Sequence, residues 1–395
     1  MIPYGHQEVS EADITTVVEV LRSDFLTQGP VIPRFEQAIA AHVGAKHAVA
    51  LNSATSALHV ACAALGLSPG EWLWTVPNTF VASANCARYC GAQVDFVDID
   101  PHTWNLSVAA LRTKLDEASR SGRLPKIVVP VHFAGQPTEQ EAIWELSRRY
   151  GFRVVEDASH SIGAARNSEP VGSCRWADIT VFSFHPVKII TSGEGGMALT
   201  NDDELAARMT MLRSHGITRD PARLSGRTAA AAGGEAQPEP PPWYYEQQLL
   251  GFNYRMTDIH AALGLSQFQR LHSYVERRNA LARVYEDALR KLPLQLPVVQ
   301  RENRSAFHLY VVRLNSAAKS HRAVFDALRA AGIGVGLHYL PVHLHPYYRA
   351  LGFAPGQFPE AERYAGEALT LPLYPALRTQ DQEWVICSLS AILES

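Results

Sequence analysis

The sequence predicts an α/β fold with two parts: a large domain with a mixed, mostly parallel sheet flanked by helices, and a smaller C-terminal α/β domain. Between residues 47 and 199, short apolar runs alternate with helical patterns, which is typical of parallel strands joined by crossover helices. The 395 residues exceed the size of a single hydrophobic core. A composition of 47% hydrophobic and 19% charged residues favours a compact globular protein.

The predicted elements follow in order. Ser10 and Asp13 form a capping box that begins a helix ending near Leu21. Strands are predicted at residues 47–51, 93–97, 126–131, 153–155 and 179–182, and helices at 55–65 and 139–150. Further on, helices are predicted at 254–271, 273–292 and 323–331, and strands at 307–314 and 334–337. We predict a large domain at residues 1–272 and a smaller one at 273–395.

Charge and cysteine content exclude several classes of protein. A net charge of -3, from 36 basic and 39 acidic residues, gives no basic surface for nucleic acid or an anionic membrane. The N-terminus lacks a basic region followed by an apolar stretch, so we expect a cytoplasmic protein. The five scattered cysteines fit neither a disulfide framework nor zinc pairs.

Residues 220–242 contain an alanine run at 229–232, glycines at 233–234 and prolines at 240–242. Such a composition has little capacity for a packed core. We predict an exposed loop here.

The segment 49–58 predicts a strand, a turn of small residues and a helix start. Small side chains let an anion approach the backbone, and the positive end of the helix favours a phosphate there. The alternative is an ordinary helix N-cap made by Ser53 or Thr55.

Asp157 follows the predicted strand at 153–155, at the edge where α/β sheets present their ligands. A carboxylate there can pair with a protonated ring nitrogen and keep a bound cofactor electron-withdrawing. The alternative is again a helix N-cap.

Lys188 lies between an apolar strand and the glycine-rich turn 193–196. Partial burial lowers the pKa of a lysine and supplies the neutral amine that forms a Schiff base. The alternative is a solvated surface lysine. A phosphate cradle, a ring-nitrogen carboxylate and such a lysine together indicate pyridoxal 5'-phosphate.

These residues resemble the DegT/DnrJ/EryC1/StrS sugar aminotransferase family, within the fold-type I pyridoxal-phosphate transferases. The resemblance covers nearly the whole chain. It rests on the lysine motif at 182–197 and on four other segments, 25–30, 77–85, 251–258 and 338–343.

The resemblance implies roles for individual residues. Lys188 would hold the cofactor and act as the catalytic acid and base. The other implied cofactor-binding residues are Ala54, Thr55 and Ser183 at the phosphate, Phe80 on the ring, Asp157 at the ring nitrogen, His160 beside the ring, and Asn253 from a neighbouring subunit. A homodimer with shared active sites is therefore implied. The implied substrate-binding residues are Tyr4, Phe25, Leu26, Thr27, Gln28, His338 and Tyr339.

Within the family, residues 2–5 and 243–247 favour a particular reaction. The resemblance implies transfer of an amino group from L-glutamate to C4 of a UDP-4-keto-6-deoxy-N-acetylhexosamine, giving UDP-4-amino-4,6-dideoxy-N-acetyl-beta-L-altrosamine for pseudaminic acid biosynthesis. The first alternative is another nucleotide-sugar aminotransferase, of the bacillosamine or perosamine type. A dehydratase relative would carry histidine at position 188, and a non-catalytic regulator would not need Lys188, Asp157 and Ser183.

A metal site is a further alternative, because His338, His343 and His345 lie close together in the sequence. No acidic or thiol ligands accompany them. We therefore predict that the protein holds no metal.

Overall fold

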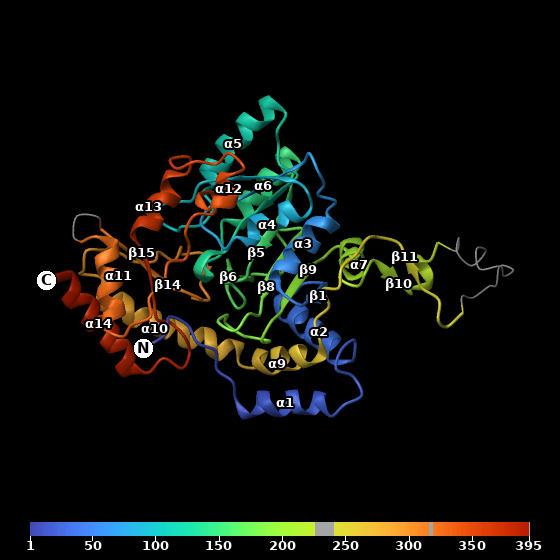
Figure 1. The fold of residues 1–395 in the computed structure, drawn as a ribbon, viewed down its shortest axis with the longest axis horizontal. Helices are drawn as coiled ribbons and strands as arrows, with labels where there is room; N and C mark the ends of the chain where they lie inside the picture. The colour runs from blue at the N-terminus through green and yellow to red at the C-terminus, as the bar shows by residue number, and fades with distance from the viewer. Residues whose placement is uncertain (226–240, 316–318, 395) are drawn as a thin grey trace.

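The computed structural model describes residues 1–225, 241–315 and 319–394. Its centre is a seven-stranded sheet with the order β1-β9-β8-β5-β4-β2-β3, flanked by helices (Figure 1). The strands are β1 (His47–Leu51), β2 (Trp72–Thr75), β3 (Gln93–Phe96), β4 (Ile127–Val129), β5 (Arg153–Asp157), β8 (Ile179–Ser183) and β9 (Gly196–Thr200). Strand β9 is antiparallel to both neighbours and the other pairings are parallel. The predicted mostly parallel sheet is therefore confirmed.

The strands predicted between residues 47 and 199 are all present, with small differences at their ends. Strand β4 is shorter than the predicted 126–131, and β5 extends to Asp157. Strand β2 has no predicted counterpart, although it pairs with both β3 and β4. Its four residues are too few to show a period of their own.

Helices surround this sheet. They are α2 (Val31–Val43), α3 (Ala54–Ala64), α4 (Ala82–Tyr89), α5 (Val108–Ser121), α6 (Gln140–Tyr150), α7 (Asp203–Leu212) and α9 (Asp258–Phe268). The predicted helix 254–271 is wrong at its start, because Thr257 is the N-cap of α9 and its side chain accepts a hydrogen bond from the backbone N–H of His260. The carbonyl of Tyr254 instead accepts a hydrogen bond from Asn52 N at 2.8 Å.

The C-terminal part has its own small sheet and helices. The sheet is β12-β14-β15, with β12 (Leu294–Gln295), β14 (Tyr310–Leu314) and β15 (Ala368–Leu371). The helices are α10 (Leu271–Leu289), α11 (His321–Ala330), α12 (Pro346–Arg349), α13 (Pro359–Glu367) and α14 (Thr379–Glu394). The predicted strand 334–337 is wrong. Within it, only Gly336 forms a bridge, and its partner is Thr370. The backbone N of Gly334 instead donates to Ile2 O of the N-terminal segment at 2.7 Å.

The N-terminal segment reaches across to the C-terminal part. Ile2 pairs with Ile333, and Leu373 N donates to Tyr4 O at 3.0 Å. Helix α10 runs across the predicted domain boundary at residue 273: Leu271 packs in a cluster with residues of the large sheet, and Tyr285 packs in the C-terminal core. The division at this residue stays a prediction.

Short strands complete the described fold. Strand β6 (Ala165–Arg166) pairs with both β7 (Glu169–Pro170) and β13 (Asn303–Arg304). Strand β10 (Ile217–Thr218) pairs with β11 (Glu246–Gln247). Of the predicted loop 220–242, residues 226–240 lie outside the described residues. Residues 220–225 contain a short 3-10 turn and are largely exposed. Within the described ranges, no helix combines the length and apolar character needed to span a bilayer.

Helix α1 (Glu11–Leu21) is attached to α9 by one buried carboxylate. The predicted capping box is confirmed: Ser10 N donates to Asp13 Oδ2 at 2.8 Å, and Asp13 N donates to Ser10 Oγ. Asp13 also accepts hydrogen bonds from the side chains of Ser266, Gln267 and Arg270 at 2.6, 2.8 and 2.6 Å. Burial alone would raise the pKa of Asp13, but the hydrogen bonds from Ser10 and Ser266 and the charge of Arg270 lower it overall.

We predict that Asp13→Ala lowers the free energy of unfolding by roughly 2 kcal/mol. This loss is smaller than the loss expected when one partner of a fully buried ion pair is removed, because Arg270 is partly exposed. Because the pKa of Asp13 is lower in the folded state than in the unfolded state, its carboxylate stabilises the fold at pH values above the unfolded-state pKa. This stabilisation is lost as the pH falls through the folded-state pKa. The difference between wild type and variant in urea denaturation should therefore shrink below about pH 4. Glu19→Ala, on the exposed face of the same helix, is the control, and an equal loss in both variants would contradict the prediction.

Candidate active site

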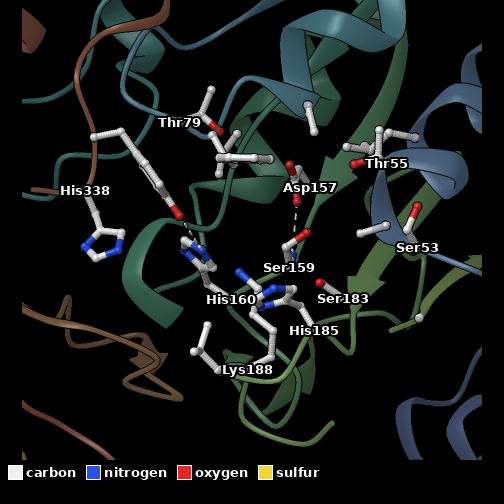
Figure 2. A pocket seen from close by; sticks show the side chains of 18 of the residues that line it. Ser53, Thr55, Thr79, Asp157, Ser159, His160, Ser183, His185, Lys188 and His338 are labelled. Atoms are coloured by element: carbon white, nitrogen blue, oxygen red, sulfur yellow. Dashed lines mark hydrogen bonds between the residues drawn. The ribbon is translucent and has the colours of Figure 1, made fainter. Parts of the chain in front are cut away.

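A cavity of about 370 Å³ opens where β5 and β8 end (Figure 2). Its walls come from the start of α3, the loop between β8 and β9, the N-terminal segment and the segment after residue 337. The structure brings together ten of the predicted site residues around it: Tyr4, Ala54, Thr55, Phe80, Asp157, His160, Ser183, Lys188, His338 and Tyr339.

The start of α3 forms one wall of the cavity. Ser53 is the N-cap, and its hydroxyl accepts a hydrogen bond from Ser56 N at 3.1 Å, so the capping alternative is correct for this residue. The next two residues, Ala54 and Thr55, begin the helix and line the cavity. Gly196 lies so close behind them that a Cβ there would stand 2.4 Å from Ala54 N. Glycine at this position therefore lets β9 lie directly against a helix end that favours anions.

Asp157 ends strand β5 and is nearly buried. Its Oδ2 accepts a hydrogen bond from Ser83 Oγ at 2.6 Å, and its Oδ1 accepts one from Ser159 N at 3.1 Å. No helix follows it, since the next described element is the short strand β6, so the capping alternative is wrong here. The carboxylate is held in place by these two serines, which sequence reasoning did not assign to the site.

Lys188 lies in the loop between β8 and β9, where Figure 2 shows its side chain beside His160, His185 and Ser183. Burial lowers the pKa of its amine to about 8, and the carboxylate of Asp157 opposes part of this shift. Lys188 as a whole is half-buried and lines the cavity, which leaves its side chain accessible to a ligand there. A neutral, accessible amine is the form required for attack on a carbonyl group.

His160 and Tyr339 form a neutral polar wall next to this lysine. Ala134 N donates to His160 Nδ1 at 3.3 Å, which assigns the ring proton to Nε2, and Nε2 lies 3.2 Å from Tyr339 Oη. Burial and the positive charge of Lys188 lower the pKa of His160 well below its ordinary value. The same causes lower the pKa of His338 to about 4. Both rings are therefore uncharged near neutral pH.

His308 is a further member of this wall that sequence reasoning missed. It is buried, and its ring centroid lies 4.4 Å from that of His160. Burial and the nearby His160 lower the pKa of His308 well below its ordinary value. It lies at the edge of an apolar run predicted as a strand, so no local signal marks it. His185 and Glu194, within the quoted lysine motif, also line the cavity.

Five predicted site residues lie outside the cavity of a single chain: Phe25, Leu26, Thr27, Gln28 and Asn253. They belong to neighbouring segments, since Thr27 pairs with Thr257 and Asp258 N donates to Leu26 O at 3.0 Å. Phe25 is 53% exposed, and Asn253 is also exposed. Residues 25–28 thus lie against the start of α9, outside the cavity, whereas Asn253 pairs with Ser214.

Two of the three histidines considered as metal ligands have other side-chain contacts. His338 Nδ1 lies 2.8 Å from Thr370 Oγ1, and His343 Nε2 lies 3.0 Å from Glu362 Oε1. Among the residues that the structure describes, no group of three histidine, cysteine, aspartate or glutamate side chains is placed to hold a metal.

The donor set of the cavity fits pyridoxal phosphate. The N-terminal end of α3 suits a phosphate, the fixed carboxylate of Asp157 suits a protonated ring nitrogen, and the low-pKa amine of Lys188 suits an aldehyde. All three face the same cavity, which is large enough for a small cofactor.

Comparisons with known proteins agree on one family. The model of the DegT/DnrJ/EryC1/StrS aminotransferase family matches residues 7–390. The spore coat polysaccharide biosynthesis protein SpsC of Bacillus subtilis is 37% identical over 98% of this chain and 95% of its own. The UDP-4-amino-4,6-dideoxy-N-acetyl-beta-L-altrosamine transaminase of Campylobacter jejuni is 35% identical over 100% of this chain and 98% of its own.

Solved structures agree with this result. Helicobacter pylori PseC, an aminotransferase involved in the biosynthesis of pseudaminic acid, superposes with a TM-score of 0.88 at 28% identity, covering 100% of this chain and 99% of its own. A Streptococcus pneumoniae protein in its PLP-form superposes with a TM-score of 0.87 at 27% identity, covering 100% of this chain and 98% of its own.

We predict that the cofactor-free protein captures pyridoxal phosphate at a rate that rises with pH, with a midpoint near the pKa of about 8 given for Lys188. The sign follows from the lowered pKa, because the neutral nucleophile is present above it and lost below it. Stopped-flow absorbance would measure the rate. Lys188→Ala should lose the lysine-linked absorption, whereas the exposed Lys291→Ala should keep it. A midpoint close to the ordinary lysine value of 10.5 would contradict the prediction.

Proposed function

Since the chain belongs to the DegT/DnrJ/EryC1/StrS aminotransferase family, and is therefore a pyridoxal-phosphate-dependent transaminase of a sugar aminotransferase family, we propose its specific reaction. It transfers an amino group from L-glutamate to C4 of a UDP-4-keto-6-deoxy-N-acetylhexosamine. The product is UDP-4-amino-4,6-dideoxy-N-acetyl-beta-L-altrosamine, a precursor of pseudaminic acid.

The observation that carries this proposal is similarity over the full length to two proteins of that reaction type. The Campylobacter jejuni transaminase matches the whole chain, and Helicobacter pylori PseC has the same fold throughout. The Bacillus subtilis relative is slightly more similar at 37% identity, and its name assigns it to spore coat polysaccharide. A different nucleotide sugar, of the bacillosamine or perosamine type, is therefore the second candidate.

We assign the cofactor contacts from the geometry of the cavity. Ala54, Thr55 and Ser183 would hold the phosphate, because they line the cavity around the N-terminal end of α3 and the end of β8. Phe80, which is 57% exposed on the cavity wall, would cover the ring. Asp157 would keep the ring nitrogen protonated. Bound pyridoxal phosphate supplies an electron sink that stabilises negative charge on a neighbouring carbon.

Lys188 performs the proton transfer in this proposal. Its Nζ is neutral often enough near neutral pH to accept a proton from the α-carbon of L-glutamate, because burial lowers its pKa to about 8. In the second half of the reaction, the same Nζ returns a proton to C4 of the sugar. His160 and Tyr339 surround this exchange with uncharged donors and acceptors, so they do not compete for the proton.

The substrate-binding residues remain proposals. Tyr4 and His338 line the cavity with ring centroids 5.0 Å apart, and they come from opposite ends of the chain. Tyr339 lies deeper, against His160. We propose that the sugar binds against these rings on the side that faces the cavity. Residues 25–28 would contact the nucleotide-sugar only across a subunit interface, since they lie outside the cavity of their own chain.

The substrate assignment is tested by converting the enzyme to its amino form with L-glutamate and adding one UDP-4-keto-6-deoxy-N-acetylhexosamine epimer at a time. We expect the L-arabino epimer to restore the starting cofactor spectrum and to give the 4-amino L-altrosamine product by NMR. A preference for the D-xylo epimer would assign the enzyme to the bacillosamine type instead. No response to either epimer would contradict both assignments.

A homodimer with shared active sites is the second part of the proposal. Asn253 is exposed and lies outside its own cavity. The exposed apolar residues Phe25 and Leu26 precede Thr27, which pairs with Thr257 in the same segment as Asn253. Large exposed apolar side chains at one place are typical of a protein interface. We propose that this surface packs on a second copy, so that Asn253 reaches the cofactor phosphate of the partner.

Co-expression of Lys188→Ala with Asn253→Asp tests this arrangement. Each variant alone should transaminate poorly, the first for lack of the amine and the second because its carboxylate repels a phosphate. If Asn253 acts across the interface, mixed dimers contain one intact site, and activity should recover to about a quarter of wild type for random pairing. No recovery in dimers shown by mass to be mixed would contradict a shared site.

A further inference from the structure

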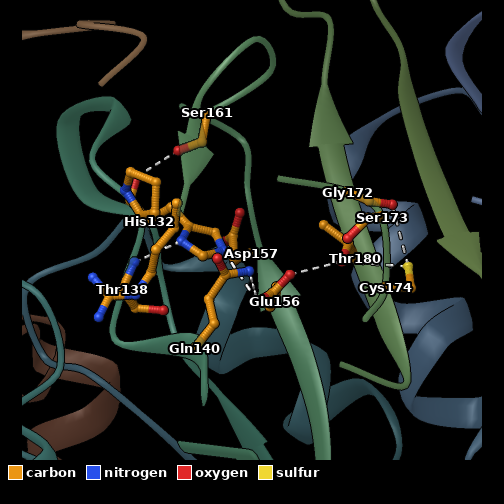
Figure 3. Close-up of polar contacts among 12 residues, drawn as sticks. His132, Thr138, Gln140, Glu156, Asp157, Ser161, Gly172, Ser173, Cys174 and Thr180 are labelled. Carbon is orange, nitrogen blue, oxygen red and sulfur yellow. Dashed lines mark hydrogen bonds and ion pairs between the residues drawn. The ribbon is translucent and has the colours of Figure 1, made fainter. Parts of the chain in front are cut away.

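A fully buried polar cluster lies on the side of β5 that faces away from the cavity (Figure 3). Successive side chains of a strand point to opposite faces, so Asp157 faces the cavity and its neighbour Glu156 faces the interior. Figure 3 shows Glu156 between Gln140 on one side and Thr180 on the other. Thr180 is the register partner of Glu156 on β8, which places both side chains on the same face.

Glu156 is surrounded by donors. Gln140 Nε2 donates to its Oε1 at 2.5 Å, and Thr180 Oγ1 donates to its Oε2 at 2.8 Å. The ring of His132 approaches the same Oε1, with Nε2 at 3.5 Å. Burial alone would raise the pKa of Glu156, but the charge and hydrogen bonding of His132 and the bonds from Gln140 and Thr180 lower it overall. The carboxylate is thus ionised while it is 1% exposed.

The orientation of His132 is fixed from both sides. Thr138 N donates to its Nδ1 at 2.9 Å, and its Nε2 lies 3.5 Å from Glu156 Oε1. Its carbonyl accepts a hydrogen bond from Ser161 Oγ at 3.0 Å. Its backbone N donates to the carbonyl of Asp157 at 3.0 Å. One residue therefore joins the buried carboxylate to the segment that carries the site residues.

The loop around His132 contacts the cavity directly. Val131 lines the cavity and pairs with Asp157, and Ala134 N donates to His160 Nδ1. The Phe133 ring packs edge-on against His160 at a centroid distance of 6.2 Å. Residues 131–134 therefore set the position of Asp157 from one side and the tautomer of His160 from the other.

From these contacts, we infer that Glu156 and His132 are positioning residues: together they hold loop 131–134 against residues 157–161 and so fix Asp157 and His160 for the cofactor. A buried ion pair adds little stability compared with apolar side chains of similar volume, so stability alone is a weak reason for an ionised carboxylate here. Supporting contacts of this kind change ligand affinity elsewhere in proteins. The link to the cofactor rests on the proposed function, whereas the link to the loop rests on geometry alone.

Glu156→Gln keeps the size of the side chain but replaces one acceptor oxygen with a donor that faces other donors. We expect faster amide hydrogen exchange in residues 131–134 and 157–161 of the cofactor-free protein. We also expect the Kd for pyridoxal phosphate, measured by absorbance, to rise roughly 10-fold, in the range found for residues that orient ligand-binding groups. The KM for L-glutamate should stay unchanged while kcat falls.

Glu367→Gln is the control, because it makes the same chemical change in a partly buried ion pair with Arg313 in the C-terminal part. If both variants lower the melting temperature alike, but only Glu156→Gln changes the exchange and the Kd, the inference is supported. If Glu156→Gln leaves the exchange of both segments unchanged, it is overturned.

A milder pair of variants covers the case in which Glu156→Gln does not fold. Thr180→Val removes one donor to Glu156 and should produce the same effects more weakly, and Thr180→Ser should restore wild-type behaviour. Equal behaviour of the two variants would overturn the inference. Failure of the wild-type protein to bind pyridoxal phosphate would contradict the proposed function instead, because the exchange experiment contains no cofactor.

Discussion

The site depends on the parallel pairing of β5 and β8 at the carboxyl edge of the central sheet. Their register pairs Asp157 with Val181, and two residues further on β8 ends at Ser183. Parallel strands end at the same edge, so one pairing places the carboxylate, the hydroxyl and the loop that carries Lys188 around a single cavity. Strand β9 returns antiparallel and closes this edge against the start of α3, where Gly196 permits contact between two backbones.

Desolvation then gives the cavity its chemical character. The amine of Lys188 and the rings of His160, His308 and His338 are all shifted toward their neutral forms by burial. Two serines hold the carboxylate of Asp157 at the cavity, and Glu156 is buried on the other side of the same strand. The strand thus separates an ionised carboxylate from a cavity in which the histidine rings are uncharged and the amine of Lys188 has a pKa of about 8.

The ends of the chain complete the cavity. Tyr4 is held by Leu373, and the segment after Gly336 is held by Thr370, so both reach the cavity from the small C-terminal sheet. A change in how this sheet packs would therefore alter the side of the cavity that we propose for the sugar without touching Asp157 or Lys188.

The sequence alone determined the alternation of strands and helices, the capping box at Ser10, and the position of Lys188 and Asp157 in segments that follow predicted strands. Each of these features depends on neighbours within a few residues. It did not determine β2, whose four residues form a strand by pairing with β3 and β4. It also did not show that residues 334–337 form no strand, because Gly334 donates its backbone hydrogen bond to the N-terminal segment. The resemblance to a family supplied the remaining candidate residues. Only the tertiary structure decided that His308 lies against His160, that Ser83 holds Asp157, and that Glu156 and His132 meet beneath it. These contacts join residues far apart in the sequence, and no local periodicity encodes a contact that register and packing create.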